Sequence, residues 1–258
     1  MTMDGKWGDL PVRILSAIIM LSVGMFAILM GGVIFHVLAA CLCGGMIWEL
    51  TRIIAPEKRG LATPLGFLAG VALFSIAFIP PFFFLPVLIA PAIVGATGIK
   101  KDRLIFAAYG SGLMLASFGL IALREFRGTD WVLWLVFVVV ATDIAGYFAG
   151  RLLGGPKFWP SVSPKKTWSG TSAGWIAAAI VGFIFAGPPL AIVSIVMSFA
   201  SQLGDIAESA IKRRGGVKDS SNLIPGHGGL LDRFDGLTAA ALVVLLVSSF
   251  IGLPQLPG

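Results

Sequence analysis

The residues best suited to chemistry lie in one stretch near the C-terminal end of the chain, residues 201–235, which reads SQLGDIAESAIKRRGGVKDSSNLIPGHGGLLDRFD. It holds five of the 13 acidic residues, five of the 19 Lys and Arg, and one of the two His. Because 57% of the chain is hydrophobic and only 12% is charged, this concentration of charge marks the stretch as the candidate site.

Polar residues in the first part of this stretch repeat at helical spacing. One face of a predicted helix carries two acids, two hydroxyls and a lysine: Ser201, Asp205, Glu208, Ser209 and Lys212. Two more carboxylates follow at Asp232 and Asp235, and carboxylate oxygens are ligands that Mg²⁺ prefers. The pattern fits a metal site or an ion path, and a set of interhelical salt bridges is the structural alternative.

The segment between these acids, KRRGGVKDSSNLIPGHGG, is basic and rich in glycine. Its glycines leave the backbone free to wrap an anion with N–H groups. Its cations Lys212, Arg213, Arg214 and Lys218 can pair with phosphate oxygens. Taken alone, the segment also fits a loop that binds lipid headgroups, but the nearby acids favour a site for phosphate and a carboxylate-bound cation. His227 within it is a candidate base, ligand or turn residue.

A second polar segment precedes this stretch. The sequence SPKKT places Lys165 and Lys166 directly before a predicted helix start, and helix N-termini favour phosphate. Asp143 lies inside an apolar run, where an ionised carboxylate costs at least about 2.5–3.5 kcal/mol, so we expect it to face a polar cavity or a partner. Gly146 and Gly150 have the small-xxx-small spacing that lets two helices approach closely.

Long apolar runs dominate the rest of the chain and predict the elements that position these residues. A membrane helix needs about 20 mostly apolar residues, and the runs are continuous rather than alternating, so helices are predicted and a transmembrane β-barrel is not. We predict an all-α polytopic membrane protein, a single domain over residues 1–258 whose active-site half covers roughly 140–240. Four prolines should kink the fourth span or make it partly re-entrant. The nine predicted spans are residues 12–30, 33–52, 61–79, 82–99, 104–123, 131–150, 170–187, 189–211 and 236–253.

The distribution of basic residues predicts the orientation of the chain. With the N-terminus in the cytoplasm, 17 of the 19 Lys and Arg fall in cytoplasmic segments, and only Arg124 and Arg127 lie outside. This bias supports nine spans in the plasma (inner) membrane of a bacterium. The net charge of +6 is spread over short loops, so it fits anionic lipid headgroups and phosphate ligands, and no nucleic-acid partner is expected. Small residues on the helix faces would allow a homodimer.

Residues 209–235 resemble the signature of the phosphatidate cytidylyltransferases, also called CDP-diacylglycerol synthases. That signature has Ser, two residues, Lys-Arg, a four-residue gap and Lys-Asp, then Pro-x-His-Gly-Gly and Asp-Arg-x-Asp, and every position is matched here. The runs DIAGYFAGR and SPKKTW, and the Gly-Asp pair ending at Asp205, are also similar to the family. The resemblance implies that CTP and phosphatidic acid react to CDP-diacylglycerol and pyrophosphate, with Mg²⁺ as cofactor.

The resemblance also implies roles for individual residues. The metal-binding aspartates of the family match Asp205 and Asp232, and the family allows a second cation, K⁺, beside the first. Because the phosphate of phosphatidic acid is already largely ionised near neutral pH, a strong general base is unnecessary, and we expect His227 to position a phosphate. The catalytic candidates are Asp205, Asp232, Lys212 and Asp235. The substrate-binding candidates are Asp143, Ser163, Lys165, Lys166, Arg213, Lys218, Asp219, His227, Gly228, Gly229 and Arg233.

The sequence leaves three alternatives open. A related enzyme could act on another lipid phosphate, such as that of a polyprenol or an archaeal ether lipid. A cation-coupled transporter would also place acids in the sixth and eighth spans, but it would leave the glycine-rich basic segment without a purpose. A lipid-binding scaffold would need the basic segment but not four nearby carboxylates. Common NTPases and zinc proteases are disfavoured, because the sequence has no P-loop or HExxH motif.

Overall fold

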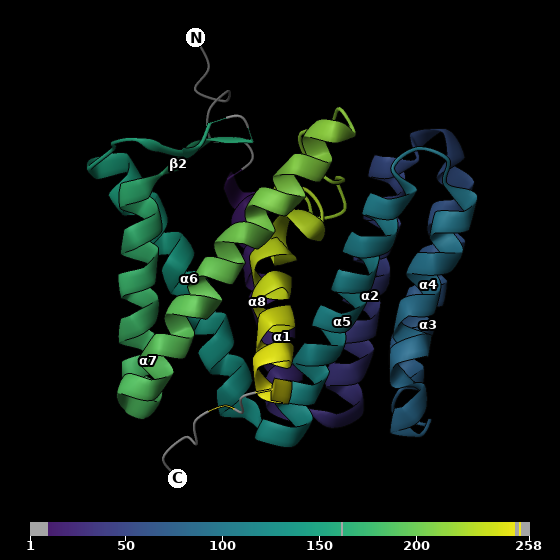
Figure 1. Cartoon of the computed structure of the whole chain (residues 1–258), viewed down its shortest axis with the longest axis horizontal. Coiled ribbons are helices and arrows are strands. Elements are labelled where there is room, and N and C mark those ends of the chain that lie inside the picture. The colour runs from purple at the N-terminus through teal and green to yellow at the C-terminus, as the bar shows by residue number, and fades with distance from the viewer. Residues whose placement is uncertain (1–9, 161, 251–252, 254–258) are drawn as a thin grey trace. The chain divides into compact units, whose positions relative to one another are not determined.

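A computed structural model describes residues 10–160, 162–250 and 253 (Figure 1). These residues are mostly helical, which confirms the predicted all-α membrane fold. The described α-helices are α1 (Leu10–Met30), α2 (Gly32–Ile54), α3 (Ala62–Ser75), α4 (Phe84–Gly98), α5 (Arg103–Arg127), α6 (Thr129–Leu152), α7 (Trp168–Arg214) and α8 (Leu231–Phe250). Shorter elements are the 3-10 helices η2 (Pro56–Leu61) and η3 (Pro81–Phe83) and the strands β1 (Lys157–Trp159) and β2 (Ser163–Thr167).

Within the described chain, seven helices are long and apolar enough to cross a membrane. The longest, α7, has 47 residues and departs from helical geometry at Ala186 and Gly187, directly before Pro188 and Pro189. It therefore contains both the seventh and the eighth predicted spans, separated by this break. α3 has only 14 residues, fewer than the third predicted span, and Pro91 lies inside α4, the fourth. The count of nine spans stays a prediction.

The chain packs as two compact units. The first unit comprises Met1–Ser111 and Arg214–Phe234, and the second comprises Gly112–Arg213 and Asp235–Gly258. The 201–235 stretch is divided between them, because Arg214–Phe234 belongs to the first unit, whereas the face around Asp205 and also Asp235 belong to the second. The single catalytic domain predicted from the sequence stays a prediction.

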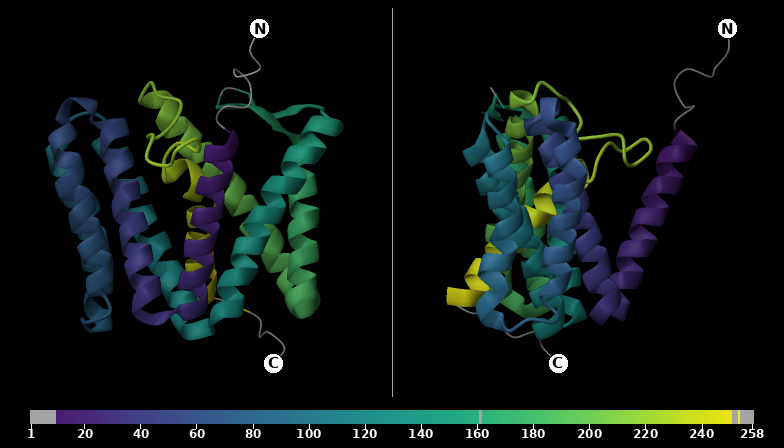
Figure 2. Two further views of the ribbon diagram at one scale, coloured as in Figure 1. Left: turned by 180° about the vertical axis from the view of Figure 1, so that it is seen from behind. Right: turned by 90° about the vertical axis from the view of Figure 1, so that its right-hand side faces the viewer.

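The first unit is built around α2, which packs against α3, and α3 in turn packs against α4. A Cβ atom added to Gly44 of α2 would lie 2.6 Å from the carbonyl oxygen of Gly66 in α3, so the two helices can meet this closely only through glycines. α1 is different: its buried residues are Ala27 and Ile28, and the right-hand view of Figure 2 shows it leaning away from α2.

Two contacts bring predicted cytoplasmic segments of the first unit together. The Lys58 ammonium, between α2 and α3, donates a 2.6 Å hydrogen bond to the Gly98 carbonyl at the end of α4. The Arg214 guanidinium lies 2.7 Å from Asp102, which precedes α5, and this hydrogen bond lowers the pKa of the Asp102 carboxyl. Segments that the basic residues predict to share one side of the membrane therefore meet at one end of this unit.

The second unit holds its helices together through small residues and hydroxyls. A Cβ atom on Gly170 of α7 would lie 2.6 Å from the carbonyl oxygen of Gly146 in α6, which confirms the close approach predicted from the small-xxx-small spacing. Thr142 of α6 donates a 2.8 Å hydrogen bond to Ser198, in the part of α7 that follows the break. These contacts fix α6 against both parts of α7 and so position the acids that the two helices carry.

Candidate active site

A hairpin that the sequence did not predict carries the lysines before α7. β1 and β2 pair antiparallel, with Lys157 opposite Thr167, and Ser163 begins β2. Successive side chains of a strand point to opposite faces, so Lys165 and Lys166 diverge. Lys165 is exposed, whereas Lys166 is half-buried and turned toward α7.

Lys166 and Asp205 form the central ion pair of the second unit. The Lys166 ammonium lies 2.5 Å from Oδ2 of Asp205, and it also donates a 3.2 Å hydrogen bond to the Gln202 carbonyl one turn earlier in α7. The two side chains are 23% and 42% exposed, so the pair is accessible from outside the protein. The structure thus joins a predicted phosphate-binding lysine to a predicted metal-binding aspartate.

Two further carboxylates of the second unit lie within electrostatic reach of this pair. The charges of Asp205 and Lys166 act both on Asp143 of α6 and on Asp235 of α8. Asp235 accepts a 2.8 Å hydrogen bond from the Gly236 N–H, within its own helix. Three aspartates from three helices and one lysine from the hairpin therefore interact in this part of the second unit.

This arrangement fits a divalent cation that shares its ligands with a substrate. No three His, Cys, Asp or Glu side chains among the described residues come close enough together to hold a metal ion by themselves. Mg²⁺ usually takes only one or two carboxylates from a protein and completes its shell with water and substrate phosphates. Asp205, which is partly exposed beside Asp143 and Asp235, meets that requirement.

Two other residues of the predicted polar face of α7, Glu208 and Lys212, pair with each other. The Lys212 ammonium lies 2.7 Å from Oε2 of Glu208, one turn earlier, and the two side chains are 15% and 3% exposed. This ion pair lies within one helix, so it is not an interhelical salt bridge of the kind that the structural alternative predicts. Arg213, which follows, is exposed.

In the first unit, the glycine-rich segment closes onto the beginning of α8. Oδ2 of Asp232, in the first turn of α8, accepts 2.8 Å hydrogen bonds from the Ser220 N–H, the Ser220 hydroxyl and the Gly229 N–H. The turn before it needs a left-handed backbone at Gly228, whose φ is 84°. The Gly229 N–H, predicted to bind substrate, thus binds a carboxylate of the protein itself.

A second carboxylate at this segment was missed by the sequence analysis. Glu49 of α2 is completely buried and accepts hydrogen bonds from the Ser220 and Ser221 hydroxyls and from the Leu230 and Leu231 N–H groups. The signal was present in the sequence, because Glu49 lies inside an apolar span. The cost of burying an acid there, which drew attention to Asp143, applies equally to it.

His227 lies in a turn that contacts α1. Its Nδ1 atom is 2.8 Å from the Ser16 hydroxyl, which also donates to the Pro225 carbonyl at 3.0 Å. The His227 N–H and carbonyl are used as well, since the N–H donates to Ile224 and the carbonyl accepts from Arg233 Nε at 2.8 Å. The structure therefore shows His227 as a turn residue, and its predicted contact with a phosphate stays a prediction. The remaining candidates, Lys218 and Asp219, are exposed.

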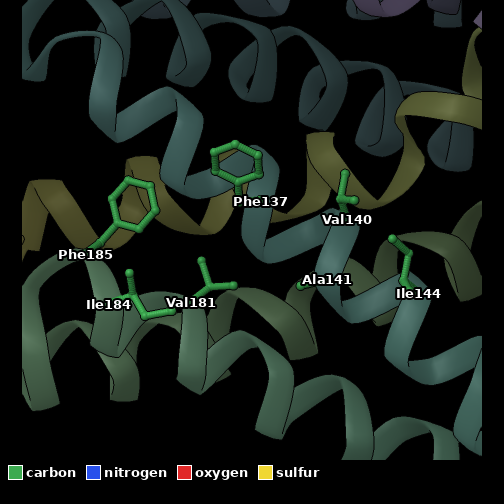
Figure 3. A pocket seen from close by; sticks show the side chains of 7 residues that line it. All are labelled: Phe137, Val140, Ala141, Ile144, Val181, Ile184 and Phe185. Carbon is green, nitrogen blue, oxygen red and sulfur yellow. The ribbon is translucent and has the colours of Figure 1, made fainter.

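The second unit also has an apolar pocket of about 260 Å³ between α6 and the first part of α7 (Figure 3). Because all of its lining side chains are apolar, it offers no group for a nucleotide or a phosphate and suits hydrocarbon only. The lining residues are Phe137, Val140, Ala141, Ile144, Val181, Ile184 and Phe185.

Comparison with known proteins agrees with this combination of a helical membrane fold and a charged, phosphate-compatible site. The model of the cytidylyltransferase family matches residues 11–251. A phosphatidate cytidylyltransferase of Brucella suis biovar 1 is 35% identical over 96% of this chain and 97% of its own length. Proteins of the same name are 35% identical in Staphylococcus saprophyticus and 30% identical in Bacillus subtilis, each over 88% of this chain and at least 93% of the relative.

The chain belongs to the cytidylyltransferase family, together with these phosphatidate cytidylyltransferases. The motif-based prediction of a nucleotidyltransferase is thereby confirmed.

Proposed function

We propose that this protein transfers the cytidylyl group of CTP to phosphatidic acid, giving CDP-diacylglycerol and pyrophosphate. The observation that carries the proposal is the similarity to curated phosphatidate cytidylyltransferases over nearly the whole length of both chains. The apolar pocket and the membrane helices suit a lipid substrate, and the lysine beside Asp205 suits a nucleotide phosphate.

In this reaction, a phosphate oxygen of phosphatidic acid attacks the α-phosphorus of CTP. One phosphorus–oxygen bond forms, the bond between the α- and β-phosphates breaks, and pyrophosphate leaves. The attacking phosphate is already ionised near neutral pH, so the protein need not remove a proton from it. Its main task is to hold two polyanions together, which requires cationic groups and orientation.

The charged residues of the second unit are suited to this task. Lys166 lies beside Asp205 at a partly exposed position, where its ammonium can turn from the carboxylate to a phosphate oxygen. Lys165 and Arg213 are exposed and free to move toward a bound nucleotide. We assign these three cations to substrate binding.

Asp205 and Asp232 are the proposed Mg²⁺ ligands, and K⁺ is the proposed second cation. The support for this pairing is the motif, because the two aspartates belong to different units. Mg²⁺ bound there would neutralise negative charge on the triphosphate. The carboxyl groups of Asp143 and Asp235 lie within electrostatic reach of Asp205 and would add oxygen atoms near a cation at that carboxylate.

The location of the protein in the inner membrane of a bacterium is part of the proposal, and so is a homodimer. Bacterial relatives and membrane-length helices support the first. Exposed small residues support the second only through general packing rules.

A single assay tests the proposed function. Purified protein in detergent is incubated with labelled CTP and phosphatidic acid, with and without Mg²⁺, and CDP-lipid and pyrophosphate are measured. We expect both products, in equal amounts, only with Mg²⁺. Product formation with a polyprenyl phosphate but not with phosphatidic acid would assign the acceptor to another lipid. Absence of pyrophosphate with either acceptor would contradict the proposal and favour a transporter or a scaffold.

A further inference from the structure

Glu49 is a completely buried acid near the C-terminal end of α2, a helix that carries no other candidate site residue. A carboxylate in such a position is stable only where donors satisfy its oxygens. The groups that donate hydrogen bonds to Glu49 therefore indicate its role.

Four hydrogen bonds reach Glu49, and all come from residues 220–231. Oε1 accepts from the Ser221 hydroxyl at 2.6 Å and from the Leu230 N–H at 2.9 Å. Oε2 accepts from the Leu231 N–H at 2.7 Å and from the Ser220 hydroxyl at 3.0 Å. One side chain of α2 thus holds the middle of the glycine-rich segment, at Ser220 and Ser221, and the start of α8.

Asp232 directly follows these residues, in the first turn of α8. The Ser220 hydroxyl lies between the two acids, 3.0 Å from Glu49 and 2.8 Å from Asp232, and it can donate its single proton to only one of them at a time. Gly229, whose N–H binds Asp232, leaves no room for a side chain, because a Cβ atom there would collide with Ser220 and Glu49. Asp232 and Glu49 therefore share the Ser220 hydroxyl, and the Gly229 N–H that binds Asp232 directly precedes the Leu230 N–H that binds Glu49.

We propose that Glu49 is a positioning residue of the cytidylyltransferase reaction, which orients Asp232 by binding the backbone and hydroxyl groups of residues 220–231. The inference rests on the proposed function, since the role of Asp232 in the site belongs to that proposal. It requires a carboxylate at position 49. A glutamine would turn an NH₂ group toward donors and could accept bonds at only one oxygen.

The test compares Glu49→Gln with the wild type and with Glu57→Gln, the same change at an exposed glutamate of η2. Each purified protein is assayed for kcat, for KM with CTP and for its Mg²⁺ dependence. Amide hydrogen exchange is followed in peptides from residues 220–231. We expect Glu49→Gln to lower kcat or Mg²⁺ affinity by roughly 10- to 100-fold and to speed exchange at residues 229–231. Glu57→Gln should match the wild type.

A merely structural role predicts a different result. Glu49→Gln would then yield less folded protein, while kcat per folded molecule and the Mg²⁺ dependence would equal those of the wild type, and this outcome would overturn the inference. If Glu49→Gln does not fold, Ser221→Ala takes its place, because it removes one of the four donors. We expect a smaller loss of kcat or Mg²⁺ affinity, and unchanged values would refute the inference.

Asp232→Asn separates this inference from the proposed function. An inactive Asp232→Asn with a fully active Glu49→Gln would refute the role of Glu49 alone. An active Asp232→Asn would refute the assignment of Asp232, and the inference would fall with it. An inactive Asp232→Asn together with the expected loss in Glu49→Gln would support both.

Discussion

Two acids of this protein show how surroundings decide the role of a residue. Asp205 is partly exposed and bound to a lysine on a hairpin, so either partner can exchange the other for a ligand. Glu49 is completely buried and bound to four donors of one segment, so it cannot reach a ligand without breaking the fold. The first arrangement suits substrate or metal binding, and the second suits positioning.

The aspartates assigned to the cation should be indispensable for turnover. We expect Asp205→Asn and Asp232→Asn each to lower kcat by at least about 100-fold, because several kcal/mol of charge stabilisation would be lost. The measurement is CDP-diacylglycerol formation by purified variants whose thermal stability is checked in parallel. Glu57→Gln is the control at an exposed site. Near-normal activity in either asparagine variant would contradict the metal assignment.

The two neighbouring lysines of β2 should behave differently. We expect Lys166→Ala to lower kcat and raise KM for CTP by about tenfold or more, since it removes the positive charge that lies beside the Asp205 carboxylate. Lys165→Ala should raise KM alone, because Lys165 is exposed. Lys157→Ala, an exposed lysine of β1, is the matched control. If the double variant at 165 and 166 keeps the KM of the wild type for both substrates, these lysines do not belong to the site.

At the scale of elements, glycines decide how closely helices meet in the second unit. We expect Gly170→Ala to destabilise the protein by about 1–3 kcal/mol, because the added methyl would lie 2.6 Å from the Gly146 carbonyl oxygen. Gly24→Ala in α1, where no atom lies within 4 Å of the added methyl, is the control and should leave stability unchanged or slightly higher. Thermal unfolding in detergent measures both, and equal stabilities would show that α6 and α7 do not pack this closely.

The contact between Arg214 and the segment before α5 should depend on pH. Because the guanidinium lowers the pKa of Asp102 from its ordinary 3.8, the pair contributes stability above pH 3.8 and loses it as the pH falls through the lowered value. We expect Asp102→Asn to lower the Tm at neutral pH and to equal the wild type in strong acid. Asparagine also tolerates the positive φ of 59° at this position. A Tm difference that does not change with pH would exclude an ionic origin.

At the scale of the whole molecule, the basic residues predict which loops face the cytoplasm. We expect single cysteines placed at Lys58, Lys101 and Lys157 to react with a membrane-impermeant reagent only in inverted vesicles. A cysteine at Arg127 should react only in intact cells. The native Cys41 and Cys43 are first replaced by alanine, and this background is the control. Labelling of Lys101 and Arg127 positions from the same side would refute the predicted topology of nine spans.

Sequence alone was sufficient for the membrane class and the family. Apolar runs of spanning length appear without knowledge of packing, because each helix satisfies its own backbone hydrogen bonds. The motif of residues 209–235 can likewise be recognised in the sequence without a structure, and the family match confirms the class of enzyme that it predicted. The hairpin of β1 and β2 was not predicted, because its short strands lack an apolar alternation.

Only the tertiary structure decided what each polar residue binds. The sequence placed Asp205, Glu208 and Lys212 on one helical face. In the structure, Lys212 forms an ion pair with Glu208, whereas Asp205 forms an ion pair with Lys166, 39 positions earlier in the chain. It also showed that the Gly229 amide, which the sequence analysis assigned to substrate, binds Asp232, and that the Leu230 and Leu231 amides bind Glu49. Spacing determines which side chains share a face, whereas hydrogen-bond partners between distant segments depend on how helices pack, and a single sequence does not contain that information in local form.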